Sequence, residues 1–175
     1  MSKERLMEPT VEPFVFSRTY DAPLDLVWAA WSSCDHMEKW WGPKGFVCDY
    51  CAMDFRPGGS WHYRLTGPNG MEMWGKFEYV EIVEGKSFSA INGFSDADGN
   101  WTRHPLDPTW PEKMMNVSTF EEKDGKTTTT TRSWPTADCD AAAFATFERG
   151  REGMTAGFTM TTDALAAYFE EMTRD

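Results

Sequence analysis

The sequence predicts an α+β domain in which a curved antiparallel sheet of about six to seven strands packs against one long C-terminal helix. Successive β-rich or alternating segments are separated by short turns, which is typical of antiparallel strands. The last part of the chain instead repeats apolar residues every three or four positions, as one face of a helix does. Such a helix must bury its apolar face, and the sheet offers the surface for it.

The N-terminal segment predicts an arm followed by the first strand. Residues 1–11 are polar and include Pro9, so we expect a flexible arm there and a single domain over residues 12–175. The run from Phe14 to Tyr20 is rich in aromatic and β-branched residues, which favours a strand.

Two short helices are expected directly after this strand. Asp21 and Pro23 suit the N-cap and the first turn of a helix. Apolar residues then recur at helical spacing over residues 24–31. A second short helix is expected over residues 35–40, and the Gly-Pro pair beginning at Gly42 ends it.

The middle of the chain predicts the remaining strands and one long loop. Gly75 lies inside a strand and indicates a bulge or a close approach to its backbone. Residues 95–112 carry no strand pattern and are expected to form a long loop. The expected strands cover residues 46–55, 61–65, 71–82, 88–94, 114–122 and 126–134.

The last helix is expected to begin at a cap formed by Asp138 or Asp140 and to reach about Met172. Three glycines interrupt its middle, and each costs about 1 kcal/mol against alanine. They indicate close packing, a bend, or room for another group. These glycines are Gly150, Gly153 and Gly157.

Charge and composition exclude several classes of protein. The chain has 17 Lys and Arg against 28 Asp and Glu, a net charge of −11, which disfavours nucleic-acid binding. No apolar run approaches the roughly 18 residues of a membrane span. The N-terminus lacks the apolar core of a signal peptide. We therefore expect a cytoplasmic protein without nucleic-acid binding or membrane insertion.

The cysteines predict neither a metal site nor a redox motif. Cys48 and Cys51 have C-x-x-C spacing, but structural zinc normally takes four ligands and no second pair follows. Residues three apart on a strand also face opposite sides. We expect ordinary buried or half-buried thiols, no metal and no cofactor.

Five segments, in order along the chain, resemble motifs of one superfamily. They are Tyr20-Asp-Ala-Pro23 with Val27-Trp28, Trp40-Trp-Gly-Pro43, Asp54-Phe-Arg-Pro-Gly-Gly59, Gly75-Lys-Phe77 with Glu81-Ile82, and Gly157-Phe158 with Leu165. The pattern resembles the START-like (SRPBCC) helix-grip superfamily, and within it the subfamily related to the C-terminal domain of the activator of heat-shock-protein ATPase. The resemblance spans residues 14–172 and implies a sheet wrapped around the C-terminal helix. The chain departs from the family pattern at Phe158, at Thr162 and in the longer loop.

The resemblance implies binding of an apolar or aromatic small molecule in a cavity between sheet and helix, without obvious turnover. Members of the superfamily also act as polyketide cyclases or aromatases, and the eukaryotic relative assists a chaperone. A small-molecule enzyme of the cyclase or hydrolase kind and a chaperone-ATPase cofactor acting through a protein interface are therefore alternatives. A homodimer is compatible with the sequence.

Inward faces of the predicted sheet and helix supply most candidates for contact with a ligand. Ligand sites are mostly apolar with a few polar groups. The alternative is that these side chains pack on one another and leave no void, and a register shift of one residue would reverse a strand's faces. The candidates are Trp61, Tyr63, Met73, Phe77, Phe94, Met115, Met154 and Phe158.

Polar and loop residues complete the candidate site. Trp101, His104 and Trp110 in the long loop are expected to form a lid, with an ordinary surface flap as the alternative. Arg151 falls within the apolar stripe of the last helix, where its guanidinium could hold a ligand carboxylate or phenolate. The alternative is an arginine at the rim, paired with an acidic residue. No motif for nucleophilic catalysis is visible.

Overall fold

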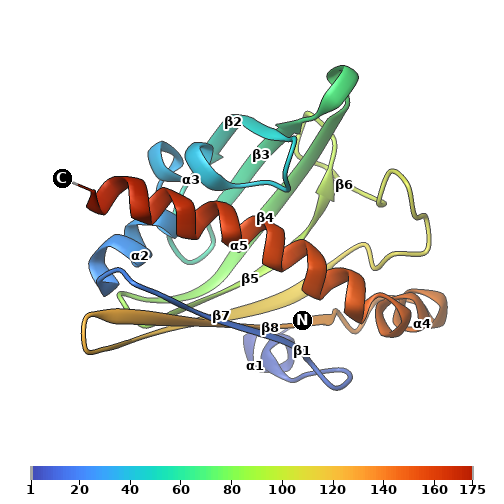
Figure 1. Cartoon of the computed structure of the whole chain (residues 1–175). Helices are drawn as coiled ribbons and strands as arrows, with labels where there is room; N and C mark the ends of the chain where they lie inside the picture. Colours follow the sequence, from blue (N-terminus) through green and yellow to red (C-terminus); the bar gives the residue numbers. More distant parts are fainter. Residues whose placement is uncertain (1, 175) are drawn as a thin grey trace.

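A computed structural model of the chain, which describes residues 2–174, contains one antiparallel sheet crossed by the C-terminal helix (Figure 1). The strand order is β1-β8-β7-β5-β4-β3-β2, and β6 pairs with β5 beside this path. The short strand β6 lies in the segment expected to be a loop, and it adds the eighth strand. The strands are β1 (Phe14–Tyr20), β2 (Val47–Met53), β3 (Ser60–Thr66), β4 (Glu72–Val83), β5 (Ser87–Ser95), β6 (Trp101–Thr102), β7 (Met114–Lys123) and β8 (Lys126–Pro135).

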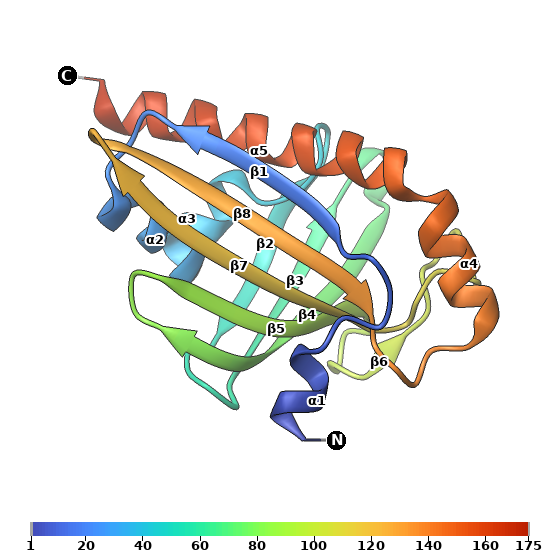
Figure 2. The same ribbon diagram turned by 90° about the horizontal axis from the view of Figure 1, so that it is seen from below.

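The helices lie on both sides of the sheet. The long α5 runs along the concave side, next to β1, and α1 lies on the opposite side (Figure 2). Lys3 in α1 forms an ion pair with Glu81 of β4, so the N-terminal segment contacts the outer face. The helices are α1 (Lys3–Met7), α2 (Leu24–Ser32), α3 (Cys34–Trp40), α4 (Ala141–Arg149) and α5 (Arg151–Thr173), with a 3-10 turn at Pro68–Gly70.

The start of α2 differs from the sequence prediction. Pro23, and not Asp21, is the N-cap residue, and it has no side chain that can accept a hydrogen bond. The backbone N–H of Leu24 instead donates to the carboxylate of Glu122 at 2.5 Å. A distant acidic residue thus satisfies a helix N-terminus that has no side-chain cap of its own.

The predicted final helix is two helices. Asp140, one of the two residues predicted as the cap, is the N-cap of α4, and its carboxylate accepts a hydrogen bond from the N–H of Ala143 at 2.8 Å. The chain then bends at Gly150, which ends α4 and begins α5. A side chain at this position would collide with the ring of Trp110, because a Cβ there would lie 2.7 Å from it. Gly150 therefore provides both the bend and the close packing that its position in the sequence indicated.

The hydrophobic core consists of two clusters along α5. The larger one joins α2 and α3 to strands β3, β4, β5 and β7, and Leu165 and Phe169 of α5 pack into it. The smaller one joins Phe14, Met114 and Phe147 near the start of α5. The two clusters are separate groups of buried residues, and half-buried side chains of α5 lie between them.

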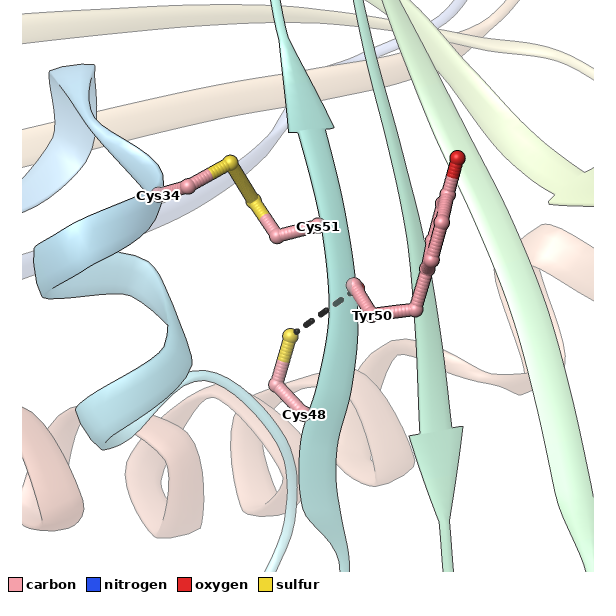
Figure 3. The surroundings of a disulfide bond; sticks show 4 residues. All are labelled: Cys34, Cys48, Tyr50 and Cys51. Atoms are coloured by element: carbon pink, nitrogen blue, oxygen red, sulfur yellow. Dashed lines mark hydrogen bonds between the residues drawn. A yellow bond between two sulfur atoms is a disulfide. The ribbon is translucent and has the colours of Figure 1, made fainter.

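A disulfide bond, which the sequence analysis did not predict, links α3 to β2. Cys34 bonds to Cys51 with their Cα atoms 5.7 Å apart (Figure 3). The expectation that Cys48 and Cys51 face opposite sides is also wrong. The β2–β3 register shifts between Cys48 and Tyr50, and Figure 3 shows both cysteines on the α3 side of β2. Cys48 is a buried free thiol, and burial raises its pKa to about 11.

Candidate functional site

An apolar cleft lies between α5 and the turn that follows α3. Its volume is about 280 Å³. We call it the Trp41 cleft, because the ring of Trp41 forms one wall while Met154 and Phe158 of α5 form the other. The cleft lies where the two core clusters adjoin, since Trp31 and Trp41 pack with the larger cluster and Met154 and Phe158 with the smaller. Its lining residues are Trp31, Trp41, Pro43, Met154, Gly157, Phe158, Thr161 and Thr162.

The Trp41 wall is held by aromatic contacts to three side chains on two elements. Its ring centroid lies 6.0 Å from that of Trp31 on α2, 5.0 Å from Trp61 and 5.6 Å from Tyr63 on β3. All three pairs are edge-to-face, an arrangement that aromatic quadrupoles favour. Interlocked rings of this kind keep the wall rigid.

Gly157 keeps the α5 side of the cleft open. A Cβ built at this position would meet nothing within 4 Å, and the residue lines the cleft. The next helical turn is fixed more tightly, because the Thr162 hydroxyl accepts a hydrogen bond from Arg18 at 3.0 Å. Arg18 in turn pairs with Asp163 at 2.6 Å. Together these contacts attach α5 to β1 beside the cleft.

Tyr63 crosses the inner face of the sheet next to Trp41. A Cβ at Gly75 would come too close to the Tyr63 hydroxyl, at 2.4 Å, so the tyrosine can adopt this position only because Gly75 has no side chain. This is the close approach that the glycine within the strand indicated. Burial raises the pKa of Tyr63 well above its usual value of 10, which keeps the phenol protonated at neutral pH.

A second, smaller void of about 80 Å³ lies beyond Tyr63, and we call it the Tyr63 pocket. Asn92 faces it from β5, directly opposite the inward-facing Phe77. The Asn92 side-chain oxygen accepts from the amide of Asn116, whose oxygen accepts from the Ser133 hydroxyl. The pocket is lined by Tyr63, Asn92, Gly93, Phe94, Trp110, Pro111 and Met114.

His104 supports the outer rim of the Tyr63 pocket. Its ring lies 4.6 Å from Phe94 and 6.4 Å from Trp110. Its Nδ1 accepts the backbone N–H groups of Leu106 and Asp107 at 3.0 and 3.1 Å. Burial lowers the pKa of His104, so both the hydrogen bonds and the environment favour the neutral ring.

Most of the candidate residues predicted from the sequence do face the interior. Strand register places Trp61, Tyr63, Met73, Phe77 and Phe94 on one face of the sheet, which is the concave one. Met154 and Phe158 line the Trp41 cleft, and Trp110 lines the Tyr63 pocket. That these side chains contact a ligand stays a prediction.

The predicted orientations of Met115 and Trp101 are wrong, and Arg151 takes the alternative position considered for it. Met114, not Met115, packs inside, so Met115 faces the opposite side of β7 next to Trp134. Trp101 lies on the outer face, with the Lys76 ammonium 4.3 Å from its ring centroid. Arg151 is paired with an acidic residue, as that alternative predicts: its guanidinium donates to Glu148 and to backbone oxygens of Glu12 and Pro13 and not into the cleft.

The cleft also contains residues that the sequence prediction omitted from the site. Trp31, Trp41 and Thr161 were not among the candidates for ligand contact, and Gly157 was named only as one of three glycines that could leave room for another group. Only the contact between α5 and the turn after α3 brings them together, and helical or strand periodicity does not reveal such a contact. Asn92 and Asn116 could have been found in the sequence, because each is an isolated polar residue at an inward position of an expected strand.

Two general findings bear on what the site holds. Among residues 2–174, no group of three or more His, Cys, Asp or Glu side chains is arranged to hold a metal ion. Within the same residues, no helix is long and apolar enough to cross a lipid bilayer.

Comparison with known proteins identifies similar sequences and folds. The model of the family "Activator of Hsp90 ATPase homolog 1-like protein" matches residues 21–170. Protein Ms6760 from Mycobacterium smegmatis is 26% identical, with a TM-score of 0.72 over 98% of this chain and 95% of that one. A protein from Arthrobacter aurescens is 23% identical, with a TM-score of 0.73 over 98% of this chain and 90% of the Arthrobacter chain.

A third structure, an AHSA1 protein from Silicibacter pomeroyi, is 17% identical. Its TM-score is 0.69 over 91% of this chain and 99% of that one. At this identity, and at that of the Arthrobacter protein, the likeness shows the fold alone. A search of curated proteins gives no match.

Proposed function

We propose that this chain, which belongs to the family of activator of Hsp90 ATPase homolog 1-like proteins, binds an apolar or aromatic small molecule in the Trp41 cleft and releases it unchanged. The observation that carries the proposal is the void itself, about 280 Å³ between apolar walls. An engineered apolar cavity of about 150 Å³ is large enough to bind benzene. The Trp41 cleft therefore has room for a molecule of two or three fused or linked rings.

The physical basis of binding is burial of apolar surface against rigid aromatic walls. Each Å² of apolar surface removed from water contributes about 25 cal/mol. Trp31 and Trp41 are held in place by their neighbours, so little side-chain entropy is lost when a ligand docks. Met154 on the opposite wall is unbranched and adapts to the shape of different ligands.

The proposal is tested with the neutral fluorescent probe N-phenyl-1-naphthylamine. We expect its emission to rise on titration with the protein and to reach saturation. Gly157→Leu fills the cleft with a side chain, so the affinity for the probe should fall at least ten-fold. Gly153→Leu is the matched control, because Gly153 lies on an exposed part of the same helix, and a Cβ there would also meet nothing within 4 Å.

Both substitutions raise helix propensity by a similar amount, so a difference between them reports on the cleft alone. Equal probe affinity in the two variants would overturn the proposal. Conversion of a bound molecule to a new compound would favour the alternative of a cyclase or hydrolase. Absence of probe binding, together with a stable complex with a chaperone ATPase, would favour the cofactor alternative.

The expected cytoplasmic location and the possibility of a homodimer remain proposals. The Cys34–Cys51 bond bears on the first, because cytoplasmic thiols reduce accessible disulfides. The redox state of this pair in the native host therefore tests the location. The subunit count from a native mass spectrum tests the homodimer.

A further inference from the structure

We propose that the Tyr63 pocket is a hydrogen-bonding subsite that recognises an uncharged oxygen function, a hydroxyl or a carbonyl, on the aromatic molecule bound in the Trp41 cleft. This inference rests on the proposed function and deepens it. It assigns the ligand a chemical class, an apolar ring system that carries one neutral oxygen.

The first hydrogen-bonding group of the subsite is the Tyr63 hydroxyl. It lies over Gly75, and strand β5 pairs with β4 so that Phe94 is directly opposite this glycine. The hydroxyl is thus fixed next to the strand whose residues 92–94 line the void. Tyr63 keeps some accessible surface although it is packed in the interior, as a side chain facing a void does. The protonated phenol can donate a hydrogen bond as well as accept one.

The second group is the side-chain amide of Asn92. Hydrogen bonds run from Ser133 to Asn116 and from Asn116 to Asn92, and each oxygen in the series accepts from the residue before. The side-chain oxygen of Asn92 is therefore occupied by the hydrogen bond from Asn116. The NH₂ group of Asn92 is left as the donor that can reach a ligand. Linked hydrogen bonds polarise one another, which strengthens the last donor.

The other lining residues of the Tyr63 pocket determine whether it can bind a charged or a neutral ligand group. Phe94, Trp110, Pro111 and Met114 complete the lining, and no charged side chain is among the lining residues. A carboxylate buried there without a cation would be strongly disfavoured. Arg151, the residue expected to hold an anion, is bonded to Glu148 and to the N-terminal segment instead. The pocket therefore fits a neutral oxygen.

The Tyr63 pocket and the Trp41 cleft are close enough for one molecule to reach both. Trp41 lines the cleft and Tyr63 lines the pocket, and the centroids of their rings are 5.6 Å apart. On the α5 side, Met154 and Phe158 of the cleft pack in the same cluster as Met114 and Trp110 of the pocket. Met154, which lines the cleft and packs in this cluster, is unbranched and can change its conformation when a ligand extends toward Tyr63.

The test compares two probes that differ by one hydroxyl, naphthalene and 2-naphthol. Each is used to displace N-phenyl-1-naphthylamine from the protein. Burial of a hydroxyl without a partner is unfavourable, so a purely apolar site would prefer naphthalene. We expect the wild type to bind 2-naphthol about five- to ten-fold more tightly, as one or two hydrogen bonds in a buried site would give.

Tyr63→Phe removes only the hydroxyl, so it should abolish the preference for 2-naphthol while leaving the affinity for naphthalene unchanged. Tyr79→Phe is the matched control, because Tyr79 is a buried tyrosine of the same sheet that lines neither void. In this control the preference should persist.

The outcomes separate the two proposals. Suppose that naphthalene and 2-naphthol both displace the probe, and that the ratio of their affinities is the same in Tyr63→Phe as in the wild type. The subsite is then disproved, and the apolar binding function stands. A wild type that prefers naphthalene leads to the same conclusion. If the fluorescent probe itself does not bind, the proposed function and the subsite fail together.

Discussion

The two halves of α5 cross the same sheet but pack against it in different ways. In the C-terminal half, Leu165 is fully buried and Phe169 is 2% exposed, enclosed by α2, α3 and the sheet. In the N-terminal half, Met154, Gly157 and Phe158 are half-buried beside the Trp41 cleft. The sealed half contributes stability, and the open half leaves space for a ligand.

This difference indicates how a small domain can hold a cavity without losing its core. The void lies between two packed clusters, so its walls are supported from both sides. Aromatic rings held edge to face form one wall, and a helix with a glycine facing the void forms the other. The contrast predicts large effects on stability from substitutions at the sealed end and small ones at the open end.

The largest effect is expected from Phe169→Ala at the sealed end. The substitution leaves a cavity among fully buried neighbours, and such changes cost about 3–5 kcal/mol of unfolding free energy. Phe158→Ala at the open end should cost less than about 2 kcal/mol, because its ring is already partly exposed to the cleft. Urea unfolding measures both. Equal losses would mean that the two halves are packed alike.

Breaking the disulfide should have the next largest effect, because it links α3 to β2 at the sealed end. The bonded residues are 17 apart, and a loop of that size corresponds to about 3 kcal/mol of stabilisation. Cys34→Ser should therefore unfold at lower urea concentration than the oxidised wild type. A reducing agent should lower the stability of the wild type and leave the variant unchanged. A variant that still responds to the reductant would contradict this assignment.

Arg151→Gln, at the open end, is expected to have a smaller effect. The substitution removes the ion pair with Glu148 and hydrogen bonds to the N-terminal segment, at a cost of about 1 kcal/mol. The affinity for the apolar probe should not change, because the guanidinium points away from the cleft. A ten-fold weaker affinity for the probe would instead support the ligand-binding role predicted from the sequence.

The smallest effect is expected from the titration of His104. Burial lowers its pKa in the folded state, so the unfolded chain binds more protons near pH 6. Above pH 6.5, the ordinary pKa of histidine, the neutral His104 ring costs the folded state nothing. As the pH falls toward the lower pKa of the folded state, protonation of the unfolded chain reduces the free energy of unfolding. The difference in unfolding free energy between about pH 7.5 and about pH 5.5 should be smaller in His104→Gln than in the wild type. An unchanged difference would show that His104 is not buried enough to titrate in this way.

The sequence predicted the fold better than the site, for physical reasons. Strand ends and turns depend on local chemistry, so each of the seven expected strands matches an observed one to within two residues at both ends. Met114 and Met115 are both apolar, so alternation alone did not decide which one faces inward. The break at Gly150 depends on Trp110, which is far away in the sequence.

The remaining errors have the same origin in long-range contacts. A bulge in β2 places Cys48 and Cys51 on one side of the strand, and Cys34 arrives there from α3. For Arg151 two positions were considered, and the choice between them depends on backbone oxygens of Glu12 and Pro13, which lie outside the helix and so outside any helical pattern. The Trp41 cleft likewise forms only where the turn after α3 meets α5.

The most direct measurement is a crystal structure of the protein soaked with 1-bromonaphthalene, with the bromine located by its anomalous scattering. If the open half of α5 is a binding site, one strong bromine peak lies between Trp41 and Phe158 in the Trp41 cleft. The same soak of Gly157→Leu shows no peak there. A wild-type cleft without bromine, or bromine found only on the outer surface, would contradict the view that this space binds a ligand.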